Sequence, residues 1–111
     1  MVIRMGTNAG VLTVWLSGEL DHHAARTLRE QVGSAVERSS AKRLRLDFSG
    51  VTFMDSSGIG LIMGRYRLML SRGGSLSVVG PSERLRRVMK LAGLEKLPIW
   101  EDTPTKEVTH P

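Results

Sequence analysis

The sequence contains no cysteine, which excludes disulfide bonds and thiolate metal sites. Aromatic residues make up only 5%, and they do not alternate with basic residues as a stacking platform for nucleic acid bases requires. No apolar run approaches the roughly 18 residues of a membrane-spanning helix. The N-terminus also lacks the apolar stretch of about 7–15 residues that a secretory signal needs. We therefore expect a cytoplasmic protein with no membrane contact.

The chain does have enough apolar material for one core. Its 111 residues suffice for one domain but are too few for two, and 41% of them are hydrophobic. The formal net charge is +5. Because the basic residues are dispersed along the chain, we expect a solvated basic surface, or one that meets an acidic protein, in place of direct nucleic acid binding.

Strand and helix patterns alternate along the sequence. Runs of β-branched and apolar residues predict strands at 2–5, 11–16, 43–48, 76–79 and 97–100. Apolar residues at helical spacing predict helices at about 22–38, 57–71 and 83–92. The order β-β-α-β-α-β-α-β is typical of an α/β domain with a mixed, mostly parallel sheet. We expect this domain over residues 1–100, followed by a polar C-terminal tail at 101–111.

The spacing of apolar residues also predicts which sides of these elements are buried. In the strand at 43–48, leucine and phenylalanine alternate with charged residues, so one face points into the core and the other stays less covered. The second helix is expected to bury Ile59, Ile62, Met63, Tyr66, Met69 and Leu70. The third helix is expected to bury Leu85, Val88 and Met89.

The segment from Met54 to Gly60 places two hydroxyl groups where a loop becomes a helix. A helix start offers unpaired backbone N–H groups and the positive end of the helix dipole, which together stabilise a phosphate group. Phosphorylation of a serine here would add about −1.5 to −2 charges and three acceptor oxygens. The alternative for the same residues is plain N-capping of the helix by Ser56 or Ser57.

A second polar segment, from Glu19 to His23, also lies at a strand-to-helix junction. Such junctions gather at one edge of a parallel sheet, so Asp21 is expected near Ser56. The two histidines belong either to this site or to the exposed first turn of the helix, and no further ligand has the spacing of a zinc site. Gly60 and Gly64, one turn apart, indicate either close packing of the helix on the sheet or a bare surface for a partner.

Three catalytic or nucleotide-binding interpretations fit the sequence poorly. A serine hydrolase based on Ser56 and a nearby histidine would lack the G-x-S-x-G elbow, because Met54 stands two residues before the serine. The glycines from Gly58 to Gly64 do not form a dinucleotide site, since no ribose-binding acid ends the next strand. A phosphate-binding loop of the Gly-Lys-Ser/Thr type is excluded because that sequence does not occur.

Together these residues resemble the STAS-domain anti-sigma factor antagonists. The block Asp55-Ser56-Ser57-Gly58 resembles the sequence motif of the wider family. The blocks Asp21-His22-His23 and Gly64-Arg65-Tyr66 resemble motifs of its sporulation branch. The resemblance implies that the unphosphorylated protein binds an anti-sigma factor that is also a serine kinase, and so releases the sporulation sigma factor. It further implies that the kinase phosphorylates Ser56 and that a PP2C-type phosphatase removes the phosphate.

The same resemblance implies that this chain is not an enzyme and needs no cofactor, because the ATP and magnesium belong to the kinase. Asp21 matches the acid beside the phosphoserine. The residues expected to contact the partner are Asp21, His22, His23, Asp55, Ser57, Gly58, Ile59, Gly60, Leu61, Gly64 and Arg65. Within the same fold, the alternative is a sensory or scaffold module that is never phosphorylated.

Overall fold

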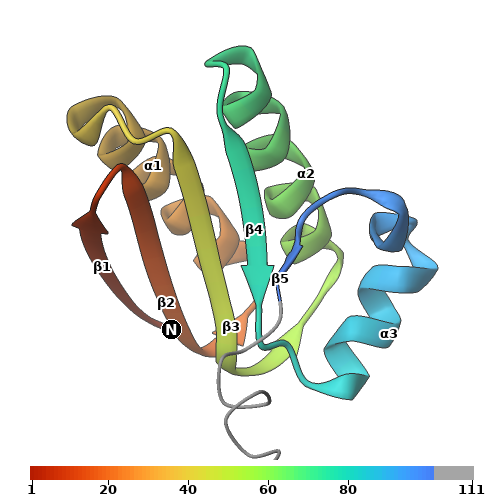
Figure 1. The fold of residues 1–111 in the computed structure, drawn as a ribbon. Helices are drawn as coiled ribbons and strands as arrows, with labels where there is room; N and C mark the ends of the chain where they lie inside the picture. Colours follow the sequence, from red (N-terminus) through yellow and green to blue (C-terminus); the bar gives the residue numbers. More distant parts are fainter. Residues whose placement is uncertain (102–111) are drawn as a thin grey trace, which may run out of the picture.

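A five-stranded sheet in the order β1-β2-β3-β4-β5 carries the fold (Figure 1). The computed structural model describes residues 1–101. The strands are β1 (Val2–Asn8), β2 (Val11–Leu20), β3 (Arg43–Met54), β4 (Ser75–Val79) and β5 (Trp100–Glu101). The helices are α1 (His22–Ser39), α2 (Ser56–Ser71) and α3 (Glu83–Leu91), with a short 3₁₀ helix at Leu94–Lys96. Only β1 is antiparallel to its neighbour among these strands, which confirms the predicted mixed, mostly parallel sheet.

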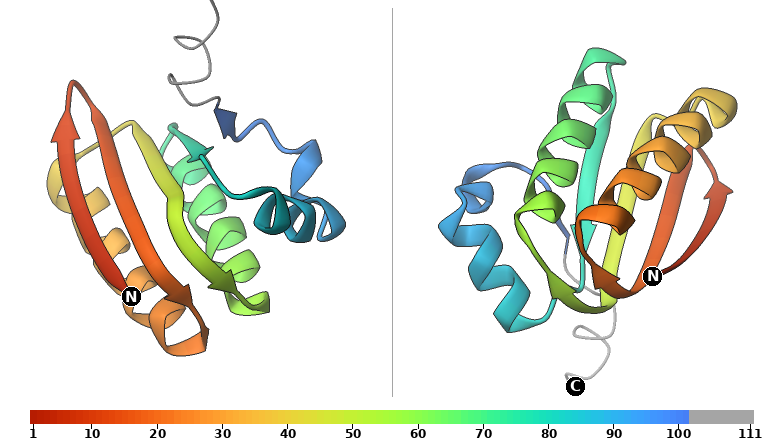
Figure 2. Two further views of the ribbon diagram at one scale, coloured as in Figure 1. Left: turned by 90° about the horizontal axis from the view of Figure 1, so that it is seen from below. Right: turned by 180° about the vertical axis from the view of Figure 1, so that it is seen from behind.

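The core lies between the sheet and the two helices α1 and α2, which lie side by side over one of its faces (Figure 2). From the sheet, the side chains that enter this core include Leu12, Val14, Leu16, Leu44, Leu46 and Phe48. From α1 they are Ala25, Leu28, Val32, Ala35 and Val36. The alternation predicted for β3 is confirmed, because its charged residues point to the opposite face, where no helix of residues 1–101 covers β1, β2 or β3.

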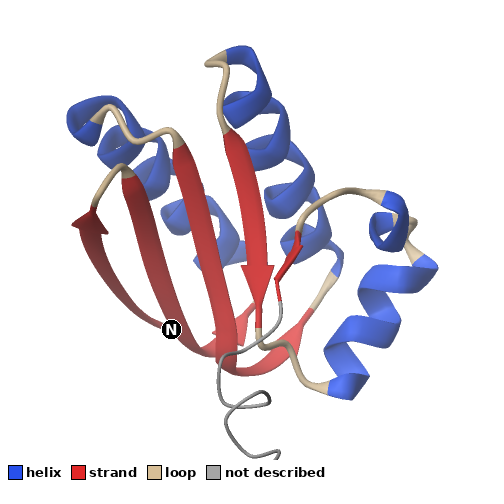
Figure 3. Ribbon diagram, viewed as in Figure 1, coloured by secondary structure: helices blue, strands red, loops and turns tan. Residues whose placement is uncertain are grey.

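Two local predictions are wrong at the C-terminal end of the fold. The pattern predicts a strand at 97–100, whereas β5 contains only Trp100 and Glu101, the second of which was expected in the tail (Figure 3). Pro98 has no N–H to donate to a neighbouring strand, and the Ile99 N–H donates to the Leu97 carbonyl at 2.9 Å, so the chain turns before it pairs with β4. The remaining residues of the predicted tail lie outside the described residues.

Two apolar residues that the spacing places inside are exposed. Leu70 is 53% exposed and Val88 is 38% exposed. The buried stripe of α2 runs through Leu61, Ile62 and Met69, and Leu70 is turned about 100° away from Met69 around the helix. Both residues flank a buried stripe, and the apolar pattern alone does not show where such a stripe ends.

Candidate functional site

The ends of β2 and β3 bring the two polar segments together. These strands are parallel neighbours in which Leu20 pairs with Met54, so Asp21 and Asp55 follow at the same edge of the sheet. The Asp55 N–H also donates to the Leu20 carbonyl at 3.4 Å. The predicted meeting of the two strand-to-helix junctions is therefore confirmed.

An aspartate caps each of the two helices that start at this edge. Oδ1 of Asp55 accepts the Ser57 N–H at 2.8 Å, and Oδ1 of Asp21 accepts the Ala24 N–H at 2.9 Å. N-capping by Ser56 or Ser57, one of the two interpretations of the sequence, is thus wrong. Ser56 occupies the first position of α2, is exposed, and donates to no side chain or carbonyl among residues 1–101. Its hydroxyl is accessible to a modifying enzyme.

Ser57 has a different environment from Ser56. It is half-buried, and its Oγ lies 3.4 Å from Nδ1 of His22 on α1. The ring of His22 also contacts the ring of His23 edge to face, with their centroids 5.9 Å apart. Among the described residues neither histidine hydrogen-bonds to an aspartate, so no serine–histidine–aspartate relay is assembled there.

The hydrogen bond that caps α1 also affects the pKa of Asp21. The Ala24 N–H that donates to Asp21 lowers the pKa of the Asp21 carboxyl below its ordinary value of 3.8, and the nearby His23 lowers it further. A lowered pKa in the folded state means that the ionised carboxylate stabilises the fold. This contribution is complete above the ordinary value and is lost as the pH falls through the folded pKa.

Replacing Asp21 by alanine is expected to lower the free energy of unfolding at neutral pH, because α1 loses its N-cap. The difference between the two proteins should shrink below pH 3.8, where the wild-type carboxylate becomes protonated. Urea unfolding of both proteins at neutral and acidic pH measures it. A difference that stays constant across this range would contradict the assigned cap.

The glycines of α2 fall into two groups. A Cβ added at Gly58 would lie 2.6 Å from Sδ of Met54, and closer still to its Cγ. At Gly60 and Gly64 an added Cβ would meet nothing within 4 Å. Close packing therefore requires Gly58 but not the other two, and the interpretation of Gly60 and Gly64 as a packing contact is wrong. They leave open helix surface instead.

The two groups of glycines should respond oppositely to substitution. Gly58→Ala is expected to lower the free energy of unfolding by about 1–3 kcal/mol, because the added methyl group forces Met54 to move. Gly64→Ala should raise it by about 0.5–1 kcal/mol, because alanine has the higher helix propensity and meets no neighbour. Chemical unfolding of the two variants compares them directly, and changes of the same sign would contradict the assignment.

A basic groove of 430 Å³ lies between α1 and α2 beside the serines. Its lining residues are His22, Ala25, Arg26, Arg29, Ser57 and Gly60, none of which is acidic. The positions of His22, Arg26 and Arg29 on α1 follow the spacing i, i+4, i+7, so they share one helix face. The sequence alone suggests that the two arginines belong to a dispersed positive charge. Their helical spacing is the signal from which their common helix face could have been predicted.

Arg65 of α2 adds a third guanidinium group next to Arg29. Its Nη1 donates to the Arg29 carbonyl at 3.3 Å and lies over Gly33, where a Cβ would come within 3.4 Å. Its Nε is buried without a partner among the described residues. Burial, and then the positive charge of Arg29, lower the pKa of Arg65. Since neither arginine forms an ion pair within residues 1–101, this side of the molecule attracts anions.

Two of the residues expected to contact a partner are core residues instead. Leu61 is only 1% exposed and Gly58 is also buried, since both face the sheet. The other nine expected contact residues are exposed or half-buried, as a contact surface requires. Across residues 1–101, no group of three or more His, Cys, Asp or Glu could hold a metal ion. None of the helices described is both long and apolar enough to cross a membrane.

A family model described as STAS domain matches residues 3–107. The chain belongs to the STAS-domain family. It is 40% identical over 101 residues to the anti-sigma F factor antagonist of Paenibacillus polymyxa, covering 90% of this chain and 86% of the relative. The anti-sigma-B factor antagonist of Bacillus subtilis is 33% identical over 90 residues, covering 81% of each chain.

The STAS fold is also seen in a solved structure, the Bacillus cell fate determinant SpoIIAA in its phosphorylated form. It is 30% identical to this chain, with a TM-score of 0.76 and coverage of 96% of both chains. The STAS domain is therefore of the anti-sigma factor antagonist type, and the predicted fold is confirmed.

Proposed function

We propose that this STAS domain is a phosphorylation-controlled anti-sigma factor antagonist of the cytoplasm. In its unphosphorylated form it binds an anti-sigma factor that is also a serine kinase, and so releases a sporulation sigma factor. The observation that carries the proposal is the exposure of Ser56. Its hydroxyl lies at the start of α2, while Asp55 caps the helix. The name of a relative, anti-sigma F factor antagonist, and the phosphorylated form of SpoIIAA support the same assignment.

The electrostatics of the site give phosphorylation a direct way to oppose binding. A phosphate on Ser56 brings about −1.5 to −2 charges next to Asp55 and beside the basic groove. The two groove arginines, Arg26 and Arg29, carry about the same charge with the opposite sign. An acidic partner surface that the free groove attracts would therefore lose that attraction and meet a new negative charge. No large conformational change is needed for this switch.

The chain itself needs no cofactor in this scheme. The kinase brings ATP and magnesium, and a PP2C-type phosphatase removes the phosphate from Ser56. The partner contacts would come from the surface around the two junctions and along α2, which includes Asp21, His22, His23, Ile59, Gly60, Gly64 and Arg65. The assignment to the sporulation branch is supported by the higher identity to the sigma F antagonist than to the sigma B antagonist.

Intact-mass spectrometry after incubation with the anti-sigma kinase of the same organism and ATP tests the proposal. We expect the addition of one phosphate, mapped to Ser56, and none in Ser56→Ala. The matched control is Ser57→Ala, which should still be phosphorylated. If the wild-type protein gained no phosphate from a kinase shown to be active on another substrate, the unphosphorylated scaffold would replace the switch.

A further inference from the structure

The face of the sheet opposite α1 and α2 is uncovered over β1, β2 and β3 (Figures 1 and 2). Parallel strands are normally covered on both faces, so an open face beside β2 and β3 is unusual. Near its centre stands Trp15 of β2, whose side chain is 45% exposed. An exposed aromatic residue on an uncovered sheet can anchor a binding partner, and its neighbours decide what that partner is.

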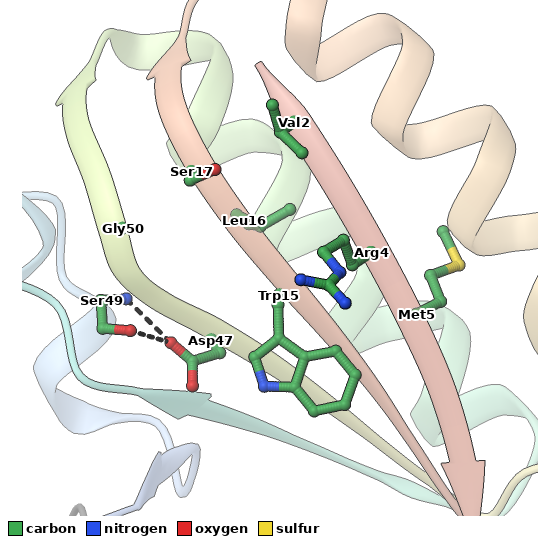
Figure 4. A pocket seen from close by; sticks show the side chains of 9 residues that line it. All are labelled: Val2, Arg4, Met5, Trp15, Leu16, Ser17, Asp47, Ser49 and Gly50. Atoms are coloured by element: carbon green, nitrogen blue, oxygen red, sulfur yellow. Dashed lines mark hydrogen bonds between the residues drawn. The ribbon is translucent and has the colours of Figure 1, made fainter.

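Trp15 stands between two opposite charges on the neighbouring strands (Figure 4). The register pairs Arg4 of β1 with Trp15, and Trp15 with Asp47 of β3, so the three residues form one row across the sheet. Asp47 accepts the N–H and hydroxyl of Ser49, but within residues 1–101 neither Asp47 nor Arg4 has an ion-pair partner.

The two arginines of β3 on this face already have an ion-pair partner. Arg43 and Arg45 of β3 both contact Glu101 of β5, at 3.2 and 2.7 Å. The open face therefore has two parts, a paired polar network over β3 to β5 and an unpaired row over β1 to β3. Among residues 1–101, only the second part offers unpaired charges of both signs to a binding partner.

The shape around Trp15 leaves room for such a partner. On one side the indole lies over Gly6, where a Cβ would come within 3.3 Å of Cζ3, so a larger residue at position 6 would press against the ring. On the other side of the indole, the sheet face has a pocket of 480 Å³, and Arg4 and Asp47 are among the residues that line it. A register shift in β3 brings Gly50 opposite Ser17, and these small residues keep the pocket open.

We propose that this face binds a second copy of the chain. The two copies would be related by a two-fold axis that runs parallel to β2, midway between the two facing sheets. Such an axis reverses the order of the strands across the interface, so Arg4 of each copy faces Asp47 of the other. The same operation brings the two Trp15 indoles together near the axis, where they can stack with an offset. Sheets pack about 10 Å apart, a separation that side chains from both faces fill.

A second copy is favoured over another partner because the row is complementary to itself. A cation, an aromatic ring and an anion in this order match their own two-fold image, and both unpaired charges gain a partner in one step. The dimer would leave α1, α2 and Ser56 on the outer side of each copy, so this inference is independent of the proposed function. Because each copy carries a formal charge of +5, we expect a weak dimer.

Sedimentation equilibrium of the full chain over a wide concentration range tests the interface. We expect a monomer–dimer equilibrium whose Kd rises at least about tenfold in Arg4→Asp and in Asp47→Arg, because each change places like charges at both symmetric contacts. The double variant R4D/D47R restores the opposite charges and should return the Kd to within about threefold of wild type. Trp15→Ala should also raise the Kd, and Arg84→Asp on exposed α3 serves as the control that leaves it unchanged.

Three results would overturn the interface. The first is a wild-type chain that stays monomeric at every concentration. The second is a dimer that is indifferent to Trp15→Ala and Arg4→Asp, which would place the contact elsewhere. The third is a double variant that fails to recover although urea unfolding shows it to be as stable as wild type. Should Asp47→Arg fail to fold, Arg4→Gln, which removes an exposed charge, should still weaken the dimer.

Discussion

Replacing Ser56 by aspartate should lower the affinity for the anti-sigma kinase by about two to three orders of magnitude. Ser56→Ala should bind as tightly as the unphosphorylated protein and should no longer be released by ATP. The reason is the position of the side chain, which is exposed beside Asp55 and next to the basic groove between α1 and α2. A fixed negative charge there repels an acidic partner surface and lowers the attraction of the groove.

The comparison with Ser57 separates this charge effect from a general disturbance of the helix start. Ser57→Ala removes a half-buried hydroxyl near His22 but adds no charge, so it should change the affinity far less. Isothermal titration calorimetry with the purified kinase measures all three variants. Equal binding of Ser56→Asp and Ser56→Ala would show that charge at this position does not control the partner.

The order of elements could be predicted because helices and strands differ in the spacing of their apolar residues. Their ends were less predictable, because tertiary contacts set them. The pair Ser17-Gly18 looks like the close of a strand, yet Gly18 adopts a φ of 102° inside β2, where the register with β3 shifts. The extra residue of this shift lies on β3, because consecutive residues of β2, Gly18 and Glu19, pair with residues 51 and 53. β2 therefore continues to Leu20, and no local pattern distinguishes such a position from a turn.

The candidate site was predictable as far as its chemistry is local. The motif around Ser56 and the parallel neighbours β2 and β3 predict that the two junctions meet. The capping residue was predicted wrongly as Ser56 or Ser57, because serine and aspartate both suit an N-cap and only the point where the backbone becomes helical shows that Asp55 is the cap. Leu61 was expected at the partner surface because it continues the motif, but the helical turn directs it into the core.

The basic groove escaped prediction because it belongs to two helices at once. Arg26 and Arg29 lie on α1, while the open space in front of them depends on Ser57 and Gly60 of α2. Neither helix shows the groove alone. The groove is deep because small side chains on α2 lie opposite long basic side chains on α1. Predicting it therefore requires knowing how the two helices are placed relative to each other.

Reversing the charge of this groove gives the second large effect that we expect. The double variant R26E/R29E should lower the affinity for the anti-sigma kinase by about 10- to 100-fold, because an acidic partner surface would meet two carboxylates in place of two guanidinium groups. Wild-type binding should weaken as the salt concentration rises, since exposed charges are screened, and the variant should lose most of this dependence.

The matched control is R84E/R87E on α3. It reverses two exposed arginines at the same i, i+3 spacing and changes the net charge equally, but lies outside the groove. It should change the affinity by less than about threefold, because loss of long-range attraction alone is screened at physiological salt. If both double variants weakened binding equally, net charge would account for the attraction. If neither did, the partner surface would carry no acidic patch opposite the groove, and the cost of desolvating the phosphate at the interface would have to oppose binding alone.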